Sequence, residues 1–412
     1  MGGRQRVAPG GAEGLVLQRH GHRGQAVVAW SVEDVAYLRS DAGRAALVEV
    51  GGYRLTDSSR VADIASARTR FGDRTAVLVE TVLLRRRAAA KLGDPSGWLF
   101  TDDALQQCTA EPVARHRARR LAGRRVHDVT CSVGAELAAL RHTAALVLGS
   151  DLDPVRLAMA RNNVGGVDLC RADALVPVTR DTVVVADPAR RSAGRRRFDP
   201  RDYTPALDLL LEAYRDRDLV VKCAPGIDFG RLGELGFHGE IELCSLGGSV
   251  REACLWSSGL ATAGRRAILL DRGEEVTDTD PDECRVAPVG RWIVDPDGAV
   301  VRAGLVRQYG TRHGLWQLDP DIAYLSGDEL PNGVRGFEVL AQIGFDVKLL
   351  RRELAARDAG AVEILVRGVD VDPDELRRRL KPRGAAQLSV VITRLGTGAH
   401  SHAVAFICRP SR

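Results

Sequence analysis

Four short apolar runs between residues 126 and 191 constrain the fold most strongly, because each run ends in an acidic residue. These residues are Asp128, Asp151, Asp173 and Asp187, and helical patterns lie between the first three runs. Apolar runs that alternate with helices predict a parallel, doubly wound sheet of the α/β class. In such sheets the ligand lies at the carboxyl ends of the strands, so we expect the four carboxylates to share one site.

The turn after the first run reads Thr130-Cys131-Ser132-Val133-Gly134. A glycine at position 134 lets the backbone approach a ligand closely. A dinucleotide-binding turn of the G-x-G-x-x-G type would have its first glycine where Ser132 stands. The turn therefore fits a nucleotide-like ligand but departs from the dinucleotide pattern.

The later acidic residues suit a nucleoside. Asp151 can accept hydrogen bonds from both hydroxyls of a ribose, and Asp173 or its neighbouring amides can meet an adenine edge. With the acid and turn after strand 1 and Asp187-Pro188 after strand 4, the stretch resembles class I S-adenosylmethionine-dependent methyltransferases. The resemblance implies a seven-stranded Rossmann-like sheet and S-adenosylmethionine as cofactor. The implied cofactor-binding residues are Asp128, Thr130, Ser132, Gly134, Asp151, Leu152, Asp173 and Ala174.

The end of the sheet favours a methyltransferase over a nicotinamide enzyme. After the fifth strand, DLVVKCAPGIDF, come the runs EIELCSL, EACLWSS and RRAILLD. The last two are joined by SGLATAG with no helix between them, which predicts a closing antiparallel hairpin at the sheet edge. A dinucleotide fold would cross over through another helix.

The methyl-acceptor site is expected around Asp187 and Pro188. In methyltransferases that act on exocyclic amines, an aromatic residue follows this motif and stacks on the base. Here Ala189 and Arg190 follow instead. The stacking group would have to be Phe198, Tyr203 or the plane of an arginine.

A second mechanism is open because Asp-Pro-Ala-Arg also resembles the motif of uridine C5 methyltransferases. Those enzymes attack the pyrimidine with a cysteine after strand 5, and Cys223 lies there. The adjacent Lys222 would have to lower the pKa of the thiol, although neighbours on a strand point to opposite faces. The alternative is that Cys223 is a small core residue.

Sequence patterns divide the chain into five segments. Residues 1–28 are rich in Gly, Arg and Gln and predict a disordered extension. Residues 29–125 carry helical patterns, 126–272 hold the methyltransferase-like sheet, and 273–334 form a connecting segment. Residues 335–412 follow a β-α-β-α-β-β order, which predicts a small α/β domain with one sheet face covered by helices.

Capping residues and one ambiguous segment refine this plan. Ser31 and Thr101 are expected to cap helices. The polar residues that follow the second cap, among them Gln107 and Thr109 (with Gln106), either lie near the cofactor or form a plain polar helix face. The stretch Val300 to Arg312 predicts a helix, with a strand as the alternative.

Composition limits the remaining classes. The chain has 412 residues and eight scattered cysteines without a C-x-x-C pair, which argues against a zinc site or a disulfide framework and fits the reducing cytoplasm. Apolar runs are too short to span a bilayer, and the basic N-terminus lacks the apolar stretch of a signal peptide. We therefore expect a cytoplasmic protein without metal or membrane partner, and the sequence defines no oligomeric state.

Arginine clusters at 115–125, 190–201 and 377–383 are candidate RNA surfaces, although each can also be a solvated face. The chain resembles bacterial class I methyltransferases with a C-terminal THUMP-like, ferredoxin-like domain. This resemblance rests on QQCTAEPVARHRARRLAG, VADPARR, AYLSGD and RGFEVL…ILVRGVDVDPDELRRRLKPRG. It implies methylation of a tRNA or rRNA base captured by that domain. The alternatives are a non-catalytic RNA-binding protein of the same fold and a methyltransferase with a non-RNA acceptor.

Overall fold

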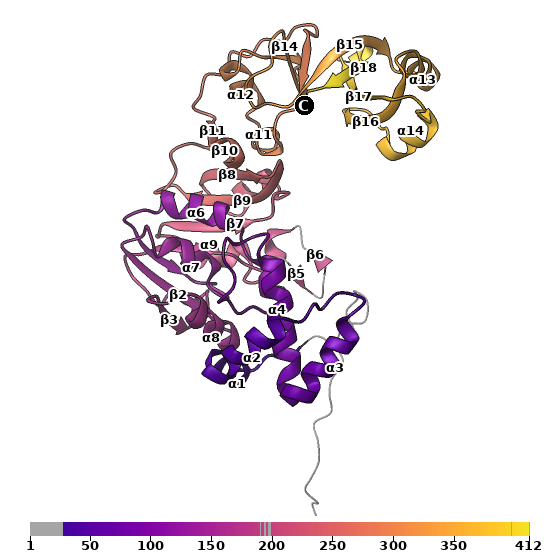
Figure 1. The fold of residues 1–412 in the computed structure, drawn as a ribbon. Coiled ribbons are helices and arrows are strands. Elements are labelled where there is room, and N and C mark those ends of the chain that lie inside the picture. Colours follow the sequence, from indigo (N-terminus) through magenta and orange to yellow (C-terminus); the bar gives the residue numbers. More distant parts are fainter. Residues whose placement is uncertain (1–27, 190, 193–194, 197–198, 397, 412) are drawn as a thin grey trace, which may run out of the picture.

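The computed structural model describes the chain except for residues 1–27, 190, 193–194, 197–198, 397 and 412 (Figure 1). The predicted extension over residues 1–28 therefore lies outside the described residues, apart from Val28. The N-terminal helices lie at one end of an elongated molecule, a large sheet occupies its middle, and a second sheet forms the other end (Figure 1).

The N-terminal region is helical, as predicted. Ser31 begins the first helix with a capping box, in which Ser31 Oγ accepts the Asp34 N–H and Asp34 accepts the Ser31 N–H, both at 3.1 Å. Thr101 caps a later helix by accepting the N–H of Ala104. The helices are α1 (Val32–Arg39), α2 (Asp41–Gly51), α3 (Arg60–Phe71), α4 (Thr75–Ala88), α5 (Asp102–Gln107) and α6 (Glu111–Arg120).

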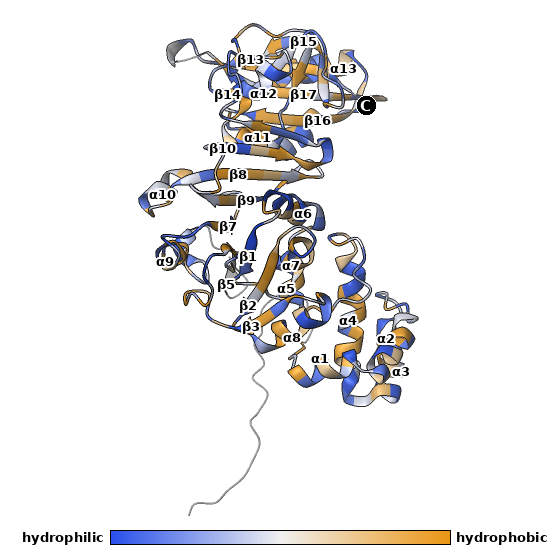
Figure 2. Ribbon diagram, turned by 90° about the vertical axis from the view of Figure 1, so that its left-hand side faces the viewer, coloured by the Kyte–Doolittle hydropathy of each residue, from blue (hydrophilic) through white to orange (hydrophobic). Residues whose placement is uncertain are grey.

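The apolar faces of α1 to α5 form one cluster that also contains Val133 and Met159 from the central domain. Figure 2 shows α2, α3 and α4 with alternating hydrophobic and hydrophilic segments, as expected for helices with one buried face. Asn163 strengthens the contact: its side chain accepts the Leu99 N–H at 2.8 Å and donates to the carbonyls of Leu99 and Val133 at 2.9 Å. The helical region is thereby fixed to the turn after the first strand.

The central sheet is doubly wound, as predicted, with the order β11-β10-β8-β9-β7-β4-β1-β2-β3. Its central strands β1, β4 and β7 pair in parallel, and β4 is apolar throughout because it is buried on both faces. The strands are β1 (Arg125–Asp128), β2 (Leu146–Asp151), β3 (Asp168–Arg171), β4 (Val183–Ala186), β7 (Leu219–Cys223), β8 (Gly239–Leu246), β9 (Ser249–Ser257), β10 (Arg265–Leu269) and β11 (Glu274–Thr277). The helices of this layer are α7 (Ala135–Leu140), α8 (Pro154–Asn163), α9 (Leu207–Ala213) and α10 (Phe229–Glu234).

Seven of these strands, β3 to β8 in spatial order, form the predicted methyltransferase sheet, and β10 and β11 extend it. The predicted hairpin between EACLWSS and RRAILLD is wrong. β9 instead pairs antiparallel with β8, and β10 pairs parallel with the other edge of β8. The tight turn lies at Gly247 and Gly248, both with positive φ, because two left-handed residues suit a two-residue hairpin turn.

The C-terminal sheet has the order β13-β14-β12-β15-β18-β17-β16. Its last part follows the predicted order of strands and helices, with α13 and α14 packed on one face through Leu350, Leu354, Leu376 and Leu380. The elements are β12 (Trp292–Val294), β13 (Trp316–Asp319), β14 (Ile322–Gly327), β15 (Gly336–Gly344), α13 (Val347–Ala356), β16 (Ala359–Arg367), α14 (Pro373–Leu380), β17 (Ala386–Leu395) and β18 (His402–Pro410).

Residues 273–334, expected as a connecting segment, are shared between the two sheets. β11 joins the central sheet, whereas β12, β13 and β14 join the C-terminal one. The helix expected from Val300 to Arg312 is present as α11 (Gly298–Ala303) and α12 (Val306–Arg312), separated at Gly304 with φ 76°. The apolar residues of these helices pack into the core of the central sheet rather than forming a separate surface.

Short elements complete the described chain. Residues 191–192 and 195–196 form a small two-stranded ribbon between β4 and α9. The ribbon consists of β5 (Arg191–Ser192) and β6 (Arg195–Arg196), and the 3-10 turns are η1 (Gly72–Arg74), η2 (Pro200–Asp202), η3 (Leu270–Arg272) and η4 (Gly398–His400). Within the described residues, the structure contains no helix of the length and apolarity that crossing a bilayer requires.

Candidate functional site

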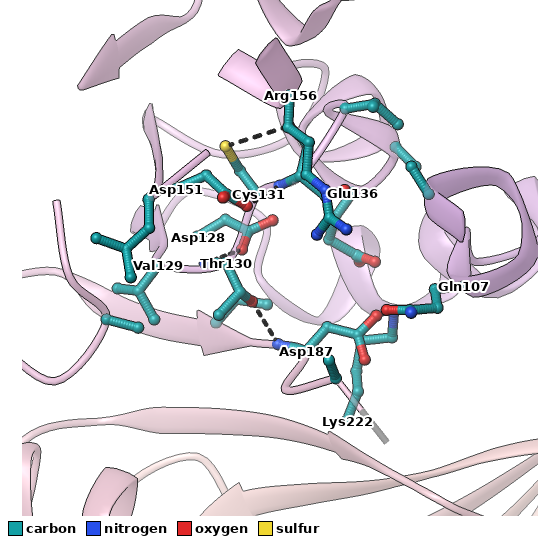
Figure 3. A pocket seen from close by; sticks show the side chains of 18 of the residues that line it. Gln107, Asp128, Val129, Thr130, Cys131, Glu136, Asp151, Arg156, Asp187 and Lys222 are labelled. Atoms are coloured by element: carbon teal, nitrogen blue, oxygen red, sulfur yellow. Dashed lines mark hydrogen bonds and ion pairs between the residues drawn. The ribbon is translucent and has the colours of Figure 1, made fainter. Parts of the chain in front are cut away.

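A cavity of about 400 Å³ opens at the carboxyl ends of the central strands, and Figure 3 shows the side chains around it. Asp128, Asp151, Asp173 and Asp187 all line it. Parallel strands place their carboxyl ends at one edge of the sheet, so the four carboxylates converge from distant parts of the sequence. Its volume falls in the range of small-molecule sites.

Hydrogen bonds of Asp128 and Thr130 link the turn after β1 to the end of β4. Asp128 is buried and its carboxylate accepts the Thr130 N–H at 3.1 Å. Burial raises the pKa of Asp128 to about 8. Thr130 Oγ1 in turn accepts the N–H of Asp187 at 2.6 Å (Figure 3), so the turn after β1 holds the end of β4 in place.

Asp151 is held by two backbone donors at the end of β2. One carboxylate oxygen accepts the Ser132 N–H at 3.0 Å and the other accepts the Asp153 N–H at 2.9 Å. Each oxygen keeps a second lone pair for a ribose hydroxyl. Ser132 has φ 49°, the left-handed conformation for which glycine is the usual residue. Leu152 beside it lines the cavity with its side chain largely exposed.

The structure shows a packing reason for glycine at position 134, beside the predicted approach to a ligand. It has φ 90°, and a Cβ there would lie 2.7 Å from Val164 Cγ2 at the end of α8. The close approach that the structure shows is therefore to α8. Among the described residues lining the cavity, neither Gly134 nor Pro188 occurs, so contacts of these two residues with a ligand stay predictions.

Asp173 and Ala174 line the part of the cavity that follows β3. Asp173 accepts the N–H of Leu175 at 2.9 Å, which forms a local turn. The Tyr214 hydroxyl donates to the Ala174 carbonyl at 2.8 Å and fixes this loop to the next layer. An adenine edge would meet a loop that is already held in place.

At the β4 end of the cavity, the ammonium group of Lys222 bonds the carboxylate of Asp187 and the hydroxyl of Thr109. Figure 3 labels Lys222 and Asp187 at this end. Lys222 is almost fully buried on β7. Burial by itself lowers its pKa, but the carboxylates of Asp187, Glu252 and Glu136 outweigh this and hold the pKa above its usual value. Lys222 is therefore a cation at the expected acceptor site.

Sequence reasoning missed this role of Lys222. The alternation of side chains along a strand could have predicted it. It places Lys222 and Cys223 on opposite faces of β7, so only one of them can face the cavity. The structure puts Lys222 at the cavity and Cys223 in the hydrophobic core, fully buried. Gln107 and Thr109 line the cavity, whereas Gln106 is not among its described lining residues, and contact of the first two with the cofactor stays a prediction.

Glu136 and Arg156 also line the cavity and had no sequence signal. Glu136 Oε1 accepts from Arg117 Nε at 3.1 Å, whereas the buried Oε2 has no hydrogen-bond partner among the described residues. Figure 3 shows the carboxylates of Glu136 and Asp187 turned toward the same space. An unpartnered buried oxygen at a cavity wall fits a ligand that carries donors or positive charge.

Part of the arginine cluster at 115–125 faces inward, which corrects its expected role as a surface. Arg117 is fully buried and its guanidinium also binds Glu252 at 2.5 Å. Arg120 binds Glu240 and Glu242 and stacks over Trp256. These arginines fasten α6 to β8 and β9 and cannot contact RNA phosphates.

Of the candidates for base stacking, Tyr203 does not line the cavity. Tyr203 is buried in the core and its hydroxyl accepts the Ala224 N–H at 3.3 Å. Phe198 and Arg190 lie outside the described residues. The residues that the structure describes around the cavity include no aromatic side chain.

The cavity fits S-adenosylmethionine. Five acidic residues but only two basic ones are found among its described lining residues, which suits a ligand with a sulfonium and an ammonium group. Asp151 offers lone pairs for a ribose, and Glu136 Oε2 is free to accept from a cation. Within the described part of the chain, no cluster of His, Cys, Asp and Glu is arranged to hold a metal ion.

Comparison with known proteins agrees with the fold and the cavity. Residues 334–410 match the family described as THUMP domain-like, and residues 31–88 match a domain of unknown function. A putative methyltransferase from Porphyromonas gingivalis W83 has the same fold, with a TM-score of 0.72 and 19% identity over 92% of this chain and 98% of that one.

Two strains of Mycobacterium tuberculosis, H37Rv and CDC 1551, have relatives named "Uncharacterized S-adenosylmethionine-dependent methyltransferase". Each is 67% identical over 357 residues, which cover 84% of this chain and 100% of the relative. The chain therefore belongs to the S-adenosylmethionine-dependent methyltransferases, enzymes whose cofactor is S-adenosylmethionine.

Proposed function

We propose that this methyltransferase acts on RNA, which its C-terminal domain captures. The observation that carries the proposal is the THUMP domain-like match over residues 334–410. Five basic residues are exposed on α14 and the turn after it, namely Arg377, which pairs with Asp374, and Arg378, Arg379, Lys381 and Arg383. Exposed arginines suit phosphate oxygens because the planar guanidinium forms two parallel hydrogen bonds. The free cysteines of the described chain fit the reducing cytoplasm, where we place the reaction.

The cofactor supplies an electrophilic methyl group on its sulfonium. We assign Asp151 and Leu152 to its ribose, Asp173 and Ala174 to its adenine, and the β1 turn to its methionine part. Asp187 then lies at the methyl-acceptor end, next to Lys222. Methyl transfer depends mainly on in-line positioning and exclusion of water, so few reacting side chains are needed.

The C5-pyrimidine variant through Cys223 gains no support, because Cys223 is fully buried in the hydrophobic core and does not line the cavity. Retained methyl transfer by Cys223→Ala would exclude this variant.

The test is transfer of labelled methyl from S-adenosylmethionine to total RNA from a strain that lacks the gene. Label in RNA supports the proposal. Absence of label, with cofactor binding intact in calorimetry, would favour a non-RNA acceptor or a non-catalytic RNA-binding protein. A protein that retains RNA but transfers no label to it would be a non-catalytic RNA-binding protein. A protein that does neither would have a non-RNA acceptor.

The basic surface of α14 predicts a defined loss of RNA affinity. Replacing both Arg378 and Arg379 by Ala should weaken binding uniformly across sequences and reduce the slope of log K against log salt by about 2. Filter binding over a salt series measures both quantities. Arg68→Ala with Arg70→Ala, two exposed residues of α3, is the matched control. An equal change in the control pair would contradict a specific role for α14.

Asp128 predicts that cofactor affinity depends on pH. Its pKa of about 8 arises from burial and then from the charge of Glu136, with Lys222 and Asp187 as the other charged neighbours. Its carboxylate attracts the sulfonium only when ionised, so affinity should rise about tenfold from about pH 7 to about pH 9. S-adenosylhomocysteine, which has no sulfonium, is the control for calorimetry. In Asp128→Asn, the affinities for S-adenosylmethionine and S-adenosylhomocysteine should have the same pH dependence.

A further inference from the structure

We infer that the methyl acceptor is a hydroxyl oxygen, the ribose 2′-OH of RNA, and that Lys222 holds this oxygen in reaction. The inference rests on the proposed function and deepens it by naming the acceptor class. Its basis is the position of Lys222, which is a buried cation at the acceptor end of the cavity. An ammonium group has three N–H donors, and the hydrogen bonds described for Lys222 use two of them, to Asp187 and Thr109.

The sign of the charge selects oxygen over nitrogen. A neutral amine gains positive charge as it takes up a methyl group, and an adjacent ammonium opposes that change. A hydroxyl loses its proton and develops negative charge on oxygen, which the ammonium stabilises. In a water-excluded cavity such an interaction is stronger than in water. Lys222 therefore lowers the barrier for an oxygen acceptor and raises it for a base amine.

The charge of Lys222 is secured from two sides. Asp187 binds it at the cavity, and the carboxylates of Glu136 and Glu252 favour its charged form from the interior. Arg117 neutralises these two carboxylates in turn, at 3.1 Å and 2.5 Å. The neighbouring carboxylates therefore keep Lys222 charged at a place where burial alone would favour its neutral form.

Asp187 is the acceptor of the proton. The hydrogen bonds described for its side chain engage only Oδ2, which leaves Oδ1 for the substrate hydroxyl. The bond between the acceptor oxygen and the methyl carbon forms while the carbon–sulfur bond breaks, and the electron pair of that bond stays on sulfur. The hydroxyl proton passes to Asp187. The oxygen nucleophile that each RNA nucleotide offers is its 2′-OH.

Alkaline hydrolysis of the labelled RNA tests the acceptor class directly. Methylation of a 2′-OH blocks cleavage of the adjacent phosphodiester, so label should appear in alkali-resistant dinucleotides. Label in mononucleotides would mean methylation of a base and would overturn the inference while leaving the RNA methyltransferase proposal standing. No label in any RNA would remove the proposed function itself.

Lys222→Met tests the assigned residue. Methionine fills a similar volume without charge, and we expect kcat to fall about 100- to 1000-fold, as on loss of one donor to a developing oxyanion. Calorimetric S-adenosylmethionine affinity should be kept, which also shows that the variant is folded. Lys222→Arg should restore part of the rate, and Lys348→Met, at an exposed position on α13, is the control. Unchanged kcat in folded Lys222→Met would overturn the role.

Discussion

Asp187→Asn should lower kcat for methyl transfer about 1000-fold, because the amide keeps the shape of the side chain but cannot take up a proton. Asp187 ends β4, its N–H is held by Thr130, and its carboxylate is held by Lys222. The backbone contacts do not depend on the charge, so the variant should still bind the cofactor. Single-turnover transfer of labelled methyl to RNA measures the loss.

Asp151→Asn is the matched comparison, since Asp151 ends a neighbouring strand and lines the same cavity. Here we expect weaker cofactor binding as the main effect, because the amide of asparagine has one acceptor oxygen instead of two for the ribose. Equal effects of the two variants on kcat and on cofactor affinity would contradict the separation of the cavity into an acceptor end and a ribose end.

Arg117→Met should lower the free energy of unfolding by about 3–5 kcal/mol, the usual loss when one partner of a buried ion pair is removed. Arg117 is fully buried, and its loss removes the cation that forms ion pairs with the buried carboxylates of Glu136 and Glu252. Urea denaturation followed by circular dichroism measures the change.

The control for this variant is Arg115→Met on the same helix. The side chain of Arg115 is 68% exposed, and its ion pair among the described residues is with Glu111, one helical turn away. Exposed pairs contribute about 0–1 kcal/mol, so the control should stay close to the wild-type stability. A loss in Arg117→Met no larger than in the control would show that the buried ion pairs do not hold α6 against the sheet.

The periodic parts of the chain could be predicted from its sequence. The strand that precedes Asp187 is a continuous apolar run because both faces of the sheet are covered there, and such a run is visible without a structure. The caps at Ser31 and Thr101 depend on residues within three positions, so local sequence is sufficient for them. The convergence of the acidic residues then follows from the rule for parallel sheets.

What could not be predicted depends on contacts between distant segments. The partners of Lys222 lie 35 and 113 positions away, and those of Arg117 lie 19 and 135 positions away. No local pattern distinguishes a buried arginine from an exposed one on a helix with four arginines. The wrongly predicted hairpin between β9 and β10 has a different cause. Strand pairing depends on which loop can form a tight turn, and that loop is the one between β8 and β9.

The pairing of β9 with β7 has a consequence for synthesis of the chain. β7 carries Lys222, and until β9 (Ser249–Ser257) is added it is the outer strand of the parallel sheet. A Val-rich strand with unpaired backbone groups is a template for association with other chains. A nascent chain released before residue 257 would therefore expose this edge. The described residues that line the reaction cavity end at position 222. They therefore leave the ribosome before β9, the strand that covers the open edge of β7.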